Sequence, residues 1–231
     1  MKSDIEATAL RTACRVCEAR GKCCLEELPQ KSRQRLRESL VLRRYSPGVT
    51  IYHQGQRADG VSVLRCGWVR LSHVTEEGKA VNVGVVGPGS ILGLNELLAD
   101  ACYHASAEVL EEAEMEFFQG QQFRSLLQDD SSLAVALLVS ISRDTHRSVA
   151  EICDIAGGRP PQQRLLHKLS HLAESCGRRT SQGVQLKLPF TVQELAESIG
   201  CSRQWTTKLL QDLDKQGLIK RRGSWITLLD A

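Results

Sequence analysis

The period of the hydrophobic pattern changes once along the chain, and this change limits the folds that the sequence can adopt. From Tyr45 to about Phe118, apolar residues alternate in short runs interrupted by glycine turns, as in YSPGVTIYHQGQ and TEEGKAVNVGVVGPGS. Runs at about 8–12-residue spacing predict an antiparallel sandwich or barrel, with no βαβ alternation. From Ser131 the apolar residues instead follow a helical period. The sequence therefore predicts an α+β protein whose sheet comes first.

Residues 131–156 carry an apolar seam. Its positions follow one another at alternating spacings of four and three, and two of them, in the middle, are polar: Ala134, Leu138, Ile141, Thr145, Ser148, Ile152 and Ile155. Such an a/d seam is typical of a two-stranded coiled coil, so we expect a homodimer helix; the alternative is a long helix lying on its own sheet. The run GGRPP at 157–161 ends the helix and marks a domain boundary.

Residues 157–231 have the pattern of a winged helix-turn-helix domain. Thr191 and Glu194 have the spacing of a capping box, which predicts a helix from Val192 that ends at Gly200. A three-residue turn then leads to a second helix capped by Ser202. The stretch LIKRRGSWITL reads as a basic hairpin that turns at its glycine.

The second of these helices has one buried and one exposed face. Its predicted buried stripe is Thr206, Leu209, Leu210 and Leu213. Because such a helix enters the major groove with its N-terminal residues at the base edges, we expect three residues to contact bases: Arg203, Gln204 and Lys208. Residues with hydroxyl groups and the basic residues of the wing are expected to contact DNA phosphates: Ser202, Thr207, Lys220, Arg221 and Arg222.

The charge distribution indicates a polyanion partner for the C-terminal part alone. From residue 157 onward there are twelve Lys and Arg against six Asp and Glu, whereas the first 156 residues have eighteen against twenty-one. No segment approaches the length of a membrane span, and the first residues lack the apolar core of a secretory signal. We therefore expect a cytoplasmic protein.

A cluster of cysteines occupies the stretch TACRVCEARGKCCLE, which contains Cys14, Cys17, Cys23 and Cys24. In a reducing compartment such a cluster is more often metal-binding or redox-active than a structural disulfide. A zinc knuckle would need a second Cys or His pair, and none follows at suitable spacing. Residues 1–27 are therefore predicted to be a cysteine-rich, cluster-binding segment before a sensor domain at 28–130.

The order of these features resembles the Crp/Fnr family of transcription regulators. The resemblance covers about Leu28 to Leu229 and rests on the glycine-punctuated sheet, the long helix and the stretch FTVQELAESIGCSRQWTTKLLQDLDKQGLI. It implies an N-terminal double-stranded β-roll of the cyclic-nucleotide-binding type, a dimerisation helix and a C-terminal winged helix-turn-helix. It also implies a homodimer that binds a palindromic operator in double-stranded DNA and works with RNA polymerase.

The spacing Cys14-x2-Cys17-x5-Cys23 is similar to the ligand loop of the oxygen-sensing fumarate–nitrate regulators of this family. That resemblance implies an iron–sulfur cluster, [4Fe–4S], that responds to redox state, oxygen or nitric oxide. The expected fourth ligand is Cys102, with Glu116 and Cys24 as alternatives. Thiol or disulfide sensing without a cluster, zinc and haem remain open.

Two residues depart from the cyclic-nucleotide members of the family. Leu94 stands where those members have a glutamate, and Ala105-Ser106 stands where they have Arg-Ser. Without the arginine a cyclic phosphate lacks its bidentate partner, so cAMP is not the expected signal. An enzyme such as a cupin-type oxygenase is not expected either, because no H-x-H pair occurs and the winged helix would be unexplained.

Overall fold

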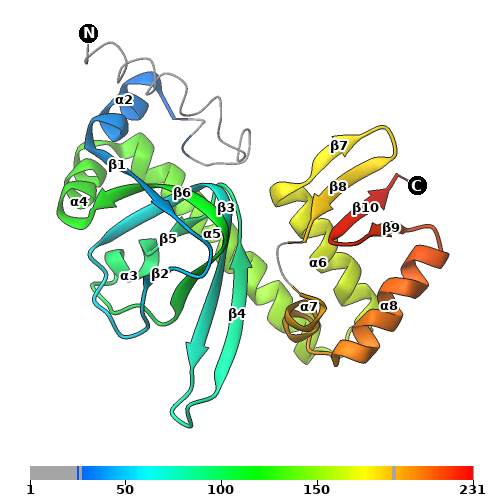
Figure 1. The fold of residues 1–231 in the computed structure, drawn as a ribbon. Coiled ribbons are helices and arrows are strands. Elements are labelled where there is room, and N and C mark those ends of the chain that lie inside the picture. Colours follow the sequence, from blue (N-terminus) through cyan, green and yellow to red (C-terminus); the bar gives the residue numbers. More distant parts are fainter. Residues whose placement is uncertain (1–24, 26–27, 189–190, 231) are drawn as a thin grey trace.

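Two long antiparallel strands organise the N-terminal domain. The computed structural model describes residue 25, residues 28–188 and residues 191–230. The elements of this domain, shown in Figure 1, are α2 (Gln30–Ser39), β1 (Leu40–Tyr45), β2 (Thr50–Tyr52), β3 (Gly60–Val74), β4 (Ala80–Val86), β5 (Ile91–Leu92), α3 (Leu94–Leu98), β6 (Ser106–Gln119), α4 (Gly120–Asp129) and α5 (Ser131–Ala156). The main sheet has the order β1-β6-β3-β4, with β2 paired to β6 and β5 paired to β3.

The sheet curls into the predicted β-roll around its own core. Val69, Val109 and Met115, which are almost fully buried, fill its interior. A second core lies where the helices cover the roll: Leu36 of α2 and Phe123 of α4 pack there with Phe118 of β6. The α+β fold class and the β-roll are therefore confirmed.

A β-bulge in the middle of β3 changes which side chains face outward. The pairing of β3 with β6 shifts register around Cys66 and Trp68, and Gly67 lies between them at φ +86°. A Cβ at Gly67 would meet the Glu112 carbonyl oxygen, so only glycine fits here. Bulges commonly re-aim the side chains that follow them. After the bulge, Val69 points into the roll and Trp68 points out of it.

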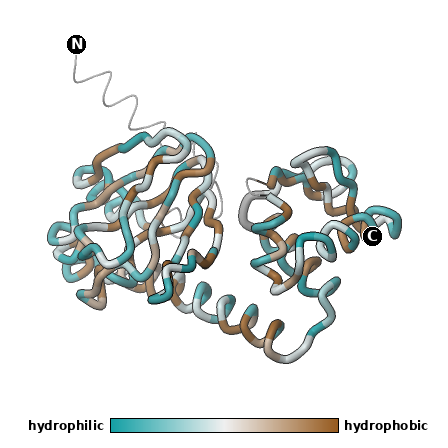
Figure 2. The backbone as a smooth tube through the Cα atoms, turned by 60° about the horizontal axis from the view of Figure 1, so that its bottom comes forward, coloured by the Kyte–Doolittle hydropathy of each residue, from teal (hydrophilic) through white to brown (hydrophobic). Residues whose placement is uncertain are grey.

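Helix α5 connects the two domains. Asp130 caps its start, because the carboxylate accepts from the N–H groups of Ser132 and Leu133 at 3.1 and 3.2 Å. Leu133 and Leu137 lie on one side of the first turns of α5 and are buried in the core beneath α4. The helix ends before Gly158, which has φ +72°. Figure 2 shows α5 crossing from the β-roll to the C-terminal domain with apolar turns along its length.

The C-terminal domain combines three helices with a small sheet. Its elements are α6 (Pro161–Cys176), β7 (Arg178–Thr180), β8 (Gly183–Lys187), α7 (Val192–Ser198), α8 (Arg203–Lys215), β9 (Ile219–Arg222) and β10 (Trp225–Leu229). The strand order is β7-β8-β10-β9, and all pairs are antiparallel. Leu165, Leu195, Leu210 and Ile226 are buried in the core that the helices share with this sheet. The winged helix-turn-helix is confirmed.

None of the helices within the described residues has the length and apolar character needed to cross a membrane.

Replacing Gly67 with alanine should destabilise the β-roll more than the same change at Gly78. Both glycines have positive φ, which costs alanine about 1–2 kcal/mol, but only Gly67 would also press a Cβ against backbone atoms. Gly78 has open space around it and serves as the matched control. Thermal unfolding of both variants measures the difference, and an equal loss of stability would contradict the role of the bulge.

Candidate nucleic-acid interface

Two local caps set the geometry of the helix-turn-helix. The predicted capping box is present: Thr191 Oγ1 accepts from the Glu194 N–H at 3.3 Å, and Glu194 Oε2 accepts from the Thr191 N–H at 2.7 Å. Gly200, at φ +64°, reverses the chain after α7. Ser202 Oγ then accepts from the Trp205 N–H at 3.2 Å, which starts α8 where the sequence predicted.

Helix α8 is fixed by its buried side and presents its other side to solvent. The predicted stripe is buried as expected, and its members are Thr206, Leu209, Leu210 and Leu213. Arg203, Gln204 and Lys208 are exposed. Within the described part of the chain, neither the Arg203 guanidinium nor the Gln204 amide has a hydrogen-bond partner. Both are therefore available to bind base edges.

The first residues of α8 line one surface hollow. Its lining consists of Ser202, Arg203, Gln204 and Thr207. The Thr207 hydroxyl donates to the Arg203 carbonyl oxygen at 2.9 Å, inside the helix. A phosphate contact from Thr207, as the sequence predicts, therefore requires its hydroxyl to turn away from that carbonyl. The geometry favours Arg203 and Gln204 as the free donors of this hollow.

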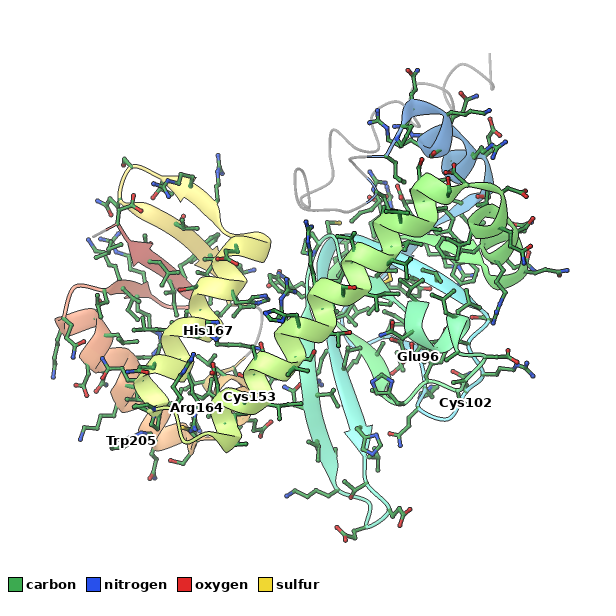
Figure 3. All side chains as sticks on the ribbon, turned by 180° about the vertical axis from the view of Figure 1, so that it is seen from behind. Glu96, Cys102, Cys153, Arg164, His167 and Trp205 are labelled. Carbon is green, nitrogen blue, oxygen red and sulfur yellow. The ribbon has the colours of Figure 1, made fainter. Side chains whose placement is uncertain are left out.

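Sequence reasoning missed two aromatic residues on the same domain. Trp205 of α8 is 44% exposed, and the Lys208 ammonium lies 5.2 Å from its ring centroid (Figure 3). Trp225 of β10 is 45% exposed and pairs with Arg222 across the wing. The sequence signal is a tryptophan near cationic residues. The helical pattern separates apolar from polar positions, but it does not show that an aromatic ring stays exposed.

The wing carries the predicted basic residues on β9. Lys220 and Arg222 are exposed, while Arg221 is half-buried and its Nε donates to the Gly223 carbonyl oxygen at 3.4 Å. Gly223, at φ +62°, makes the turn that the sequence predicted. The wing and the start of α8 thus present cations and hydrogen-bond donors on one domain, which suits the edge and backbone of a duplex.

The predicted cluster ligands Cys14, Cys17 and Cys23, and the alternative Cys24, lie outside the described residues. Cys102 has an exposed thiol in the loop after α3, where it forms a single β-bridge with Arg57 (Figure 3). Over residues 28–188 and 191–230, no three His, Cys, Asp or Glu side chains gather in a way that could hold a metal ion. Ligation by Cys102 stays a prediction.

Glu116, the other alternative ligand, lies on β6 beside Arg65. The two side chains are largely buried, and Arg65 Nε lies 3.6 Å from the Glu116 carboxylate. Burial raises the pKa of the Glu116 carboxyl above its ordinary value, although Arg65 and Arg37 lower it in part. The structure thus gives Glu116 an ion pair within the β-roll. Among the remaining thiols, Cys153 is exposed on α5 rather than buried as a structural thiol would be.

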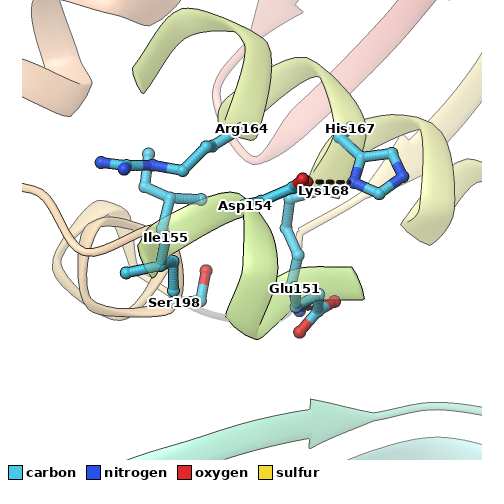
Figure 4. A pocket seen from close by; sticks show the side chains of 8 residues that line it. Glu151, Asp154, Ile155, Arg164, His167, Lys168 and Ser198 are labelled. Atoms are coloured by element: carbon cyan, nitrogen blue, oxygen red, sulfur yellow. Dashed lines mark hydrogen bonds and ion pairs between the residues drawn. The ribbon is translucent and has the colours of Figure 1, made fainter. Parts of the chain in front are cut away.

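Polar contacts join α6, and the linker residue Arg159 before it, to the end of α5. The buried Asp154 carboxylate receives Arg159 Nη1 at 2.9 Å and His167 Nδ1 at 3.0 Å, and Lys168 Nζ lies 2.9 Å from Glu151 Oε1. Figure 4 shows Asp154, His167, Glu151 and Lys168 around a small pocket between α5, α6 and α7. These contacts connect the end of α5 directly to the domain that carries α8.

Comparison with known proteins identifies the family. Residues 42–130 match the cyclic nucleotide-binding domain, and residues 163–231 match the Crp-like helix-turn-helix domain. The chain is 30% identical over 198 residues to the global nitrogen regulator of Synechococcus elongatus, covering 83% of this chain and 86% of that protein. The chain belongs to the Crp/Fnr family. It is a Crp-type DNA-binding transcription regulator.

A further relative supports the same assignment, and a solved structure shares the fold. The cAMP-activated global transcriptional regulator CRP of Haemophilus influenzae is 26% identical over 200 residues, covering 82% of this chain and 84% of that protein. The structure of FixK2 from Bradyrhizobium japonicum superposes with a TM-score of 0.71 at 16% identity, covering 83% of this chain and 93% of that chain. The latter likeness concerns the fold alone.

Replacing Arg203 with alanine should weaken specific DNA binding by about 1–3 kcal/mol, because a bidentate contact to a base is lost. Salt-dependent binding to unrelated DNA should survive, since the wing cations remain. Lys215→Ala, at the far end of α8, is the matched control and should change sequence preference little. Selection of binding sites from random duplexes by each variant measures the effect, and an unchanged preference for Arg203→Ala would refute the assignment.

Proposed function

We propose that this Crp/Fnr regulator senses redox state or a gas, oxygen or nitric oxide, through an iron–sulfur cluster of the [4Fe–4S] type. Its ligands in this proposal are Cys14, Cys17, Cys23 and Cys102. The observation that carries the proposal is the Cys-x2-Cys-x5-Cys spacing directly before a β-roll of the Crp type. The regulator then binds a palindromic operator as a homodimer and acts together with RNA polymerase.

The donor set suits such a group. Four thiolates are the usual ligands of a [4Fe–4S] cluster, and the Cys102 thiol is exposed. Arg15, Arg20 and Lys22 lie among the N-terminal cysteines in sequence, where cations favour a net anionic group. When bound, the cluster supplies a centre that oxygen or nitric oxide can alter.

The chain connects the cysteine segment to the dimer helix. Leu25, directly after Cys24, packs against the core that contains Leu133 and Leu137 of α5. On α2, the buried Ser32 hydroxyl donates to the Asp130 carboxylate that caps α5, and this hydrogen bond lowers the pKa of Asp130 below its usual value. A rearrangement of the cysteine segment would therefore act on the first turn of α5.

The homodimer proposal rests on the exposed apolar face of α5. Leu138 is 62% exposed and Ile152 is 64% exposed, and Val149 and Ile155 extend the same face. Large exposed apolar side chains that share one face of a helix indicate a partner helix. A second copy would bring two α8 helices to half-sites about 34 Å apart, one turn of DNA.

The β-roll does not offer the anchors that a cyclic phosphate needs at the expected positions. Leu94 and Ala105 are apolar and buried, at 5% and 3% exposure. Neither side chain can donate a hydrogen bond or balance the phosphate charge. This favours a signal other than cAMP, although some relatives are cAMP-activated by name.

A second candidate is a cluster-free regulator that responds to thiol oxidation or to a small ligand other than cAMP. The exposed thiols of Cys102 and Cys153 favour it, because accessible thiols are the ones that oxidants reach. The two candidates differ in iron and sulfide content.

Protein purified without oxygen should be brown, should contain iron and acid-labile sulfide, and should lose its colour in air. Cys17→Ser and Cys102→Ser should each remove or destabilise the chromophore, whereas Cys153→Ser on α5 should leave it unchanged. A colourless protein with zinc or without metal would refute the cluster and favour the thiol-sensing candidate. A stable chromophore in Cys102→Ser alone would reassign the fourth ligand.

Replacing Leu138 and Ile152 together with glutamate should convert a dimer into a monomer, because two charges would enter an apolar seam. Val139→Glu is the matched control, since Val139 is also exposed but lies on another side of α5. Sedimentation and operator binding measure the outcome. A double variant that stays dimeric would place the dimer contact elsewhere.

A further inference from the structure

The outer face of β3 and β6 holds the C-terminal domain. Trp68 points out of the β-roll, yet it is only 8% exposed because it is packed into the core of the winged helix-turn-helix domain with residues such as Leu195 and Leu210. Val85 of β4 and Leu110 of β6 pack against the same core. An outward tryptophan on a β-roll is thus buried by the neighbouring domain.

Three ion pairs lie on this face, and two of them join the two domains. Arg70 Nη1 lies 2.7 Å from Glu194 Oε1 on α7, while its Nη2 lies 2.8 Å from Glu108 Oε2 on β6. Lys187 Nζ of β8 lies 2.6 Å from Glu111 Oε1 of β6. The Glu194 side chain is 13% exposed, so its pair with Arg70 is poorly screened by solvent.

The contact reaches the start of the helix-turn-helix itself. Glu194 caps α7 through Oε2 and binds Arg70 through Oε1, so one carboxylate serves both the helix and the domain contact. Burial raises the pKa of this carboxyl, but the hydrogen bonds from Thr191 and Arg70 outweigh burial and hold the pKa below its ordinary value. The pair therefore stays charged at neutral pH.

The bulge at Gly67 creates this face. Trp68 and Arg70 are two residues apart, so they project from the same side of β3, opposite Glu111 and Glu108 of β6 in the strand register. Val69 between them remains in the β-roll core. The local backbone thus selects which side chains the C-terminal domain meets.

We propose that this face, made of Trp68, Arg70, Glu108, Leu110 and Glu111, is a docking surface for the winged helix-turn-helix domain. Trp68 and Arg70 are positioning residues that fix the orientation of α8 relative to α5. The domain is then held at two places, at this surface and at the His167–Asp154 and Lys168–Glu151 contacts between α6 and α5. Helix α8 lies on the side away from the β-roll, so the docked domain keeps its DNA-binding face free (Figure 1).

The docking surface has the same role whatever signal the sensor domain receives. Docking removes rotational freedom from the C-terminal domain before it meets DNA, and such preorganisation strengthens binding. Release of the surface would let the domain turn about the α5–α6 junction, and the two half-sites of an operator would then be matched less often.

A charge-exchange experiment on the full chain tests the docking surface. Lys187→Glu and Glu111→Lys each place like charges 2.6 Å apart in the present geometry, whereas the double variant restores an opposite pair. The exchange separates docking from any direct effect of charge on DNA, because the double variant has the original net charge. Arg179→Glu, which breaks an exposed pair with Asp230 inside the C-terminal domain, is the control.

The emission of Trp68 reports docking directly. The chain has three tryptophans, and Trp205→Phe with Trp225→Phe leaves Trp68 alone. In this background each single charge reversal should shift the emission to longer wavelength, as water reaches the ring, and the double variant should reverse the shift.

With the native tryptophans, each single variant should bind a selected operator duplex about three- to tenfold more weakly, and the double variant should recover.

Amide hydrogen exchange of α7 gives a second readout, which should quicken in the single variants and recover in the double variant. Emission and exchange that do not respond to the single reversals would overturn the proposal. Effects that add in the double variant instead of cancelling would also overturn it, because they would show independent surface charges. If operator binding stays unchanged while docking is lost, Trp68 and Arg70 do not position α8 for DNA binding.

Discussion

The burial of Leu133 and Leu137 in the β-roll core is the contact on which the rest of the arrangement depends. It fixes the first turns of α5 against α2, α4 and β6, so the helix leaves the sensor domain in one direction. The remaining turns present an exposed apolar face and connect to α6 through the Lys168–Glu151 ion pair. Without this burial, the proposed signal from the cysteine segment would have no rigid element that connects it to the domain carrying α8.

The C-terminal domain could be predicted almost residue by residue because its signals are local. The capping box of Thr191 and Glu194, the cap at Ser202 and the stripe that begins at Thr206 depend only on neighbours within one or two turns. The β-roll was predictable in class, from alternation and glycine turns. Its register was not, because strands β3 and β6 are separated by more than thirty residues along the chain.

The contacts between the domains could not be predicted from the sequence for a related reason. Arg70 and Glu194 are 124 residues apart, and an arginine on a strand reads as an ordinary solvated charge. Trp68 reads as a core residue of its own sheet, whereas the bulge sends it to the neighbouring domain. For the proposed iron–sulfur cluster, the sequence supplies the spacing of three cysteines, and the position of any fourth ligand depends on how the chain folds.

The bulge at Gly67 also limits how the length of this chain can vary during evolution. Because side chains alternate along a strand, removing one residue between Leu64 and Trp68 would turn Trp68 and Arg70 into the β-roll and Val69 out of it. The tip of the β3–β4 hairpin, around Gly78, has open space and bears no such restriction. Insertions and deletions in relatives that keep the same domain contact should therefore accumulate at the tip and avoid the middle of β3.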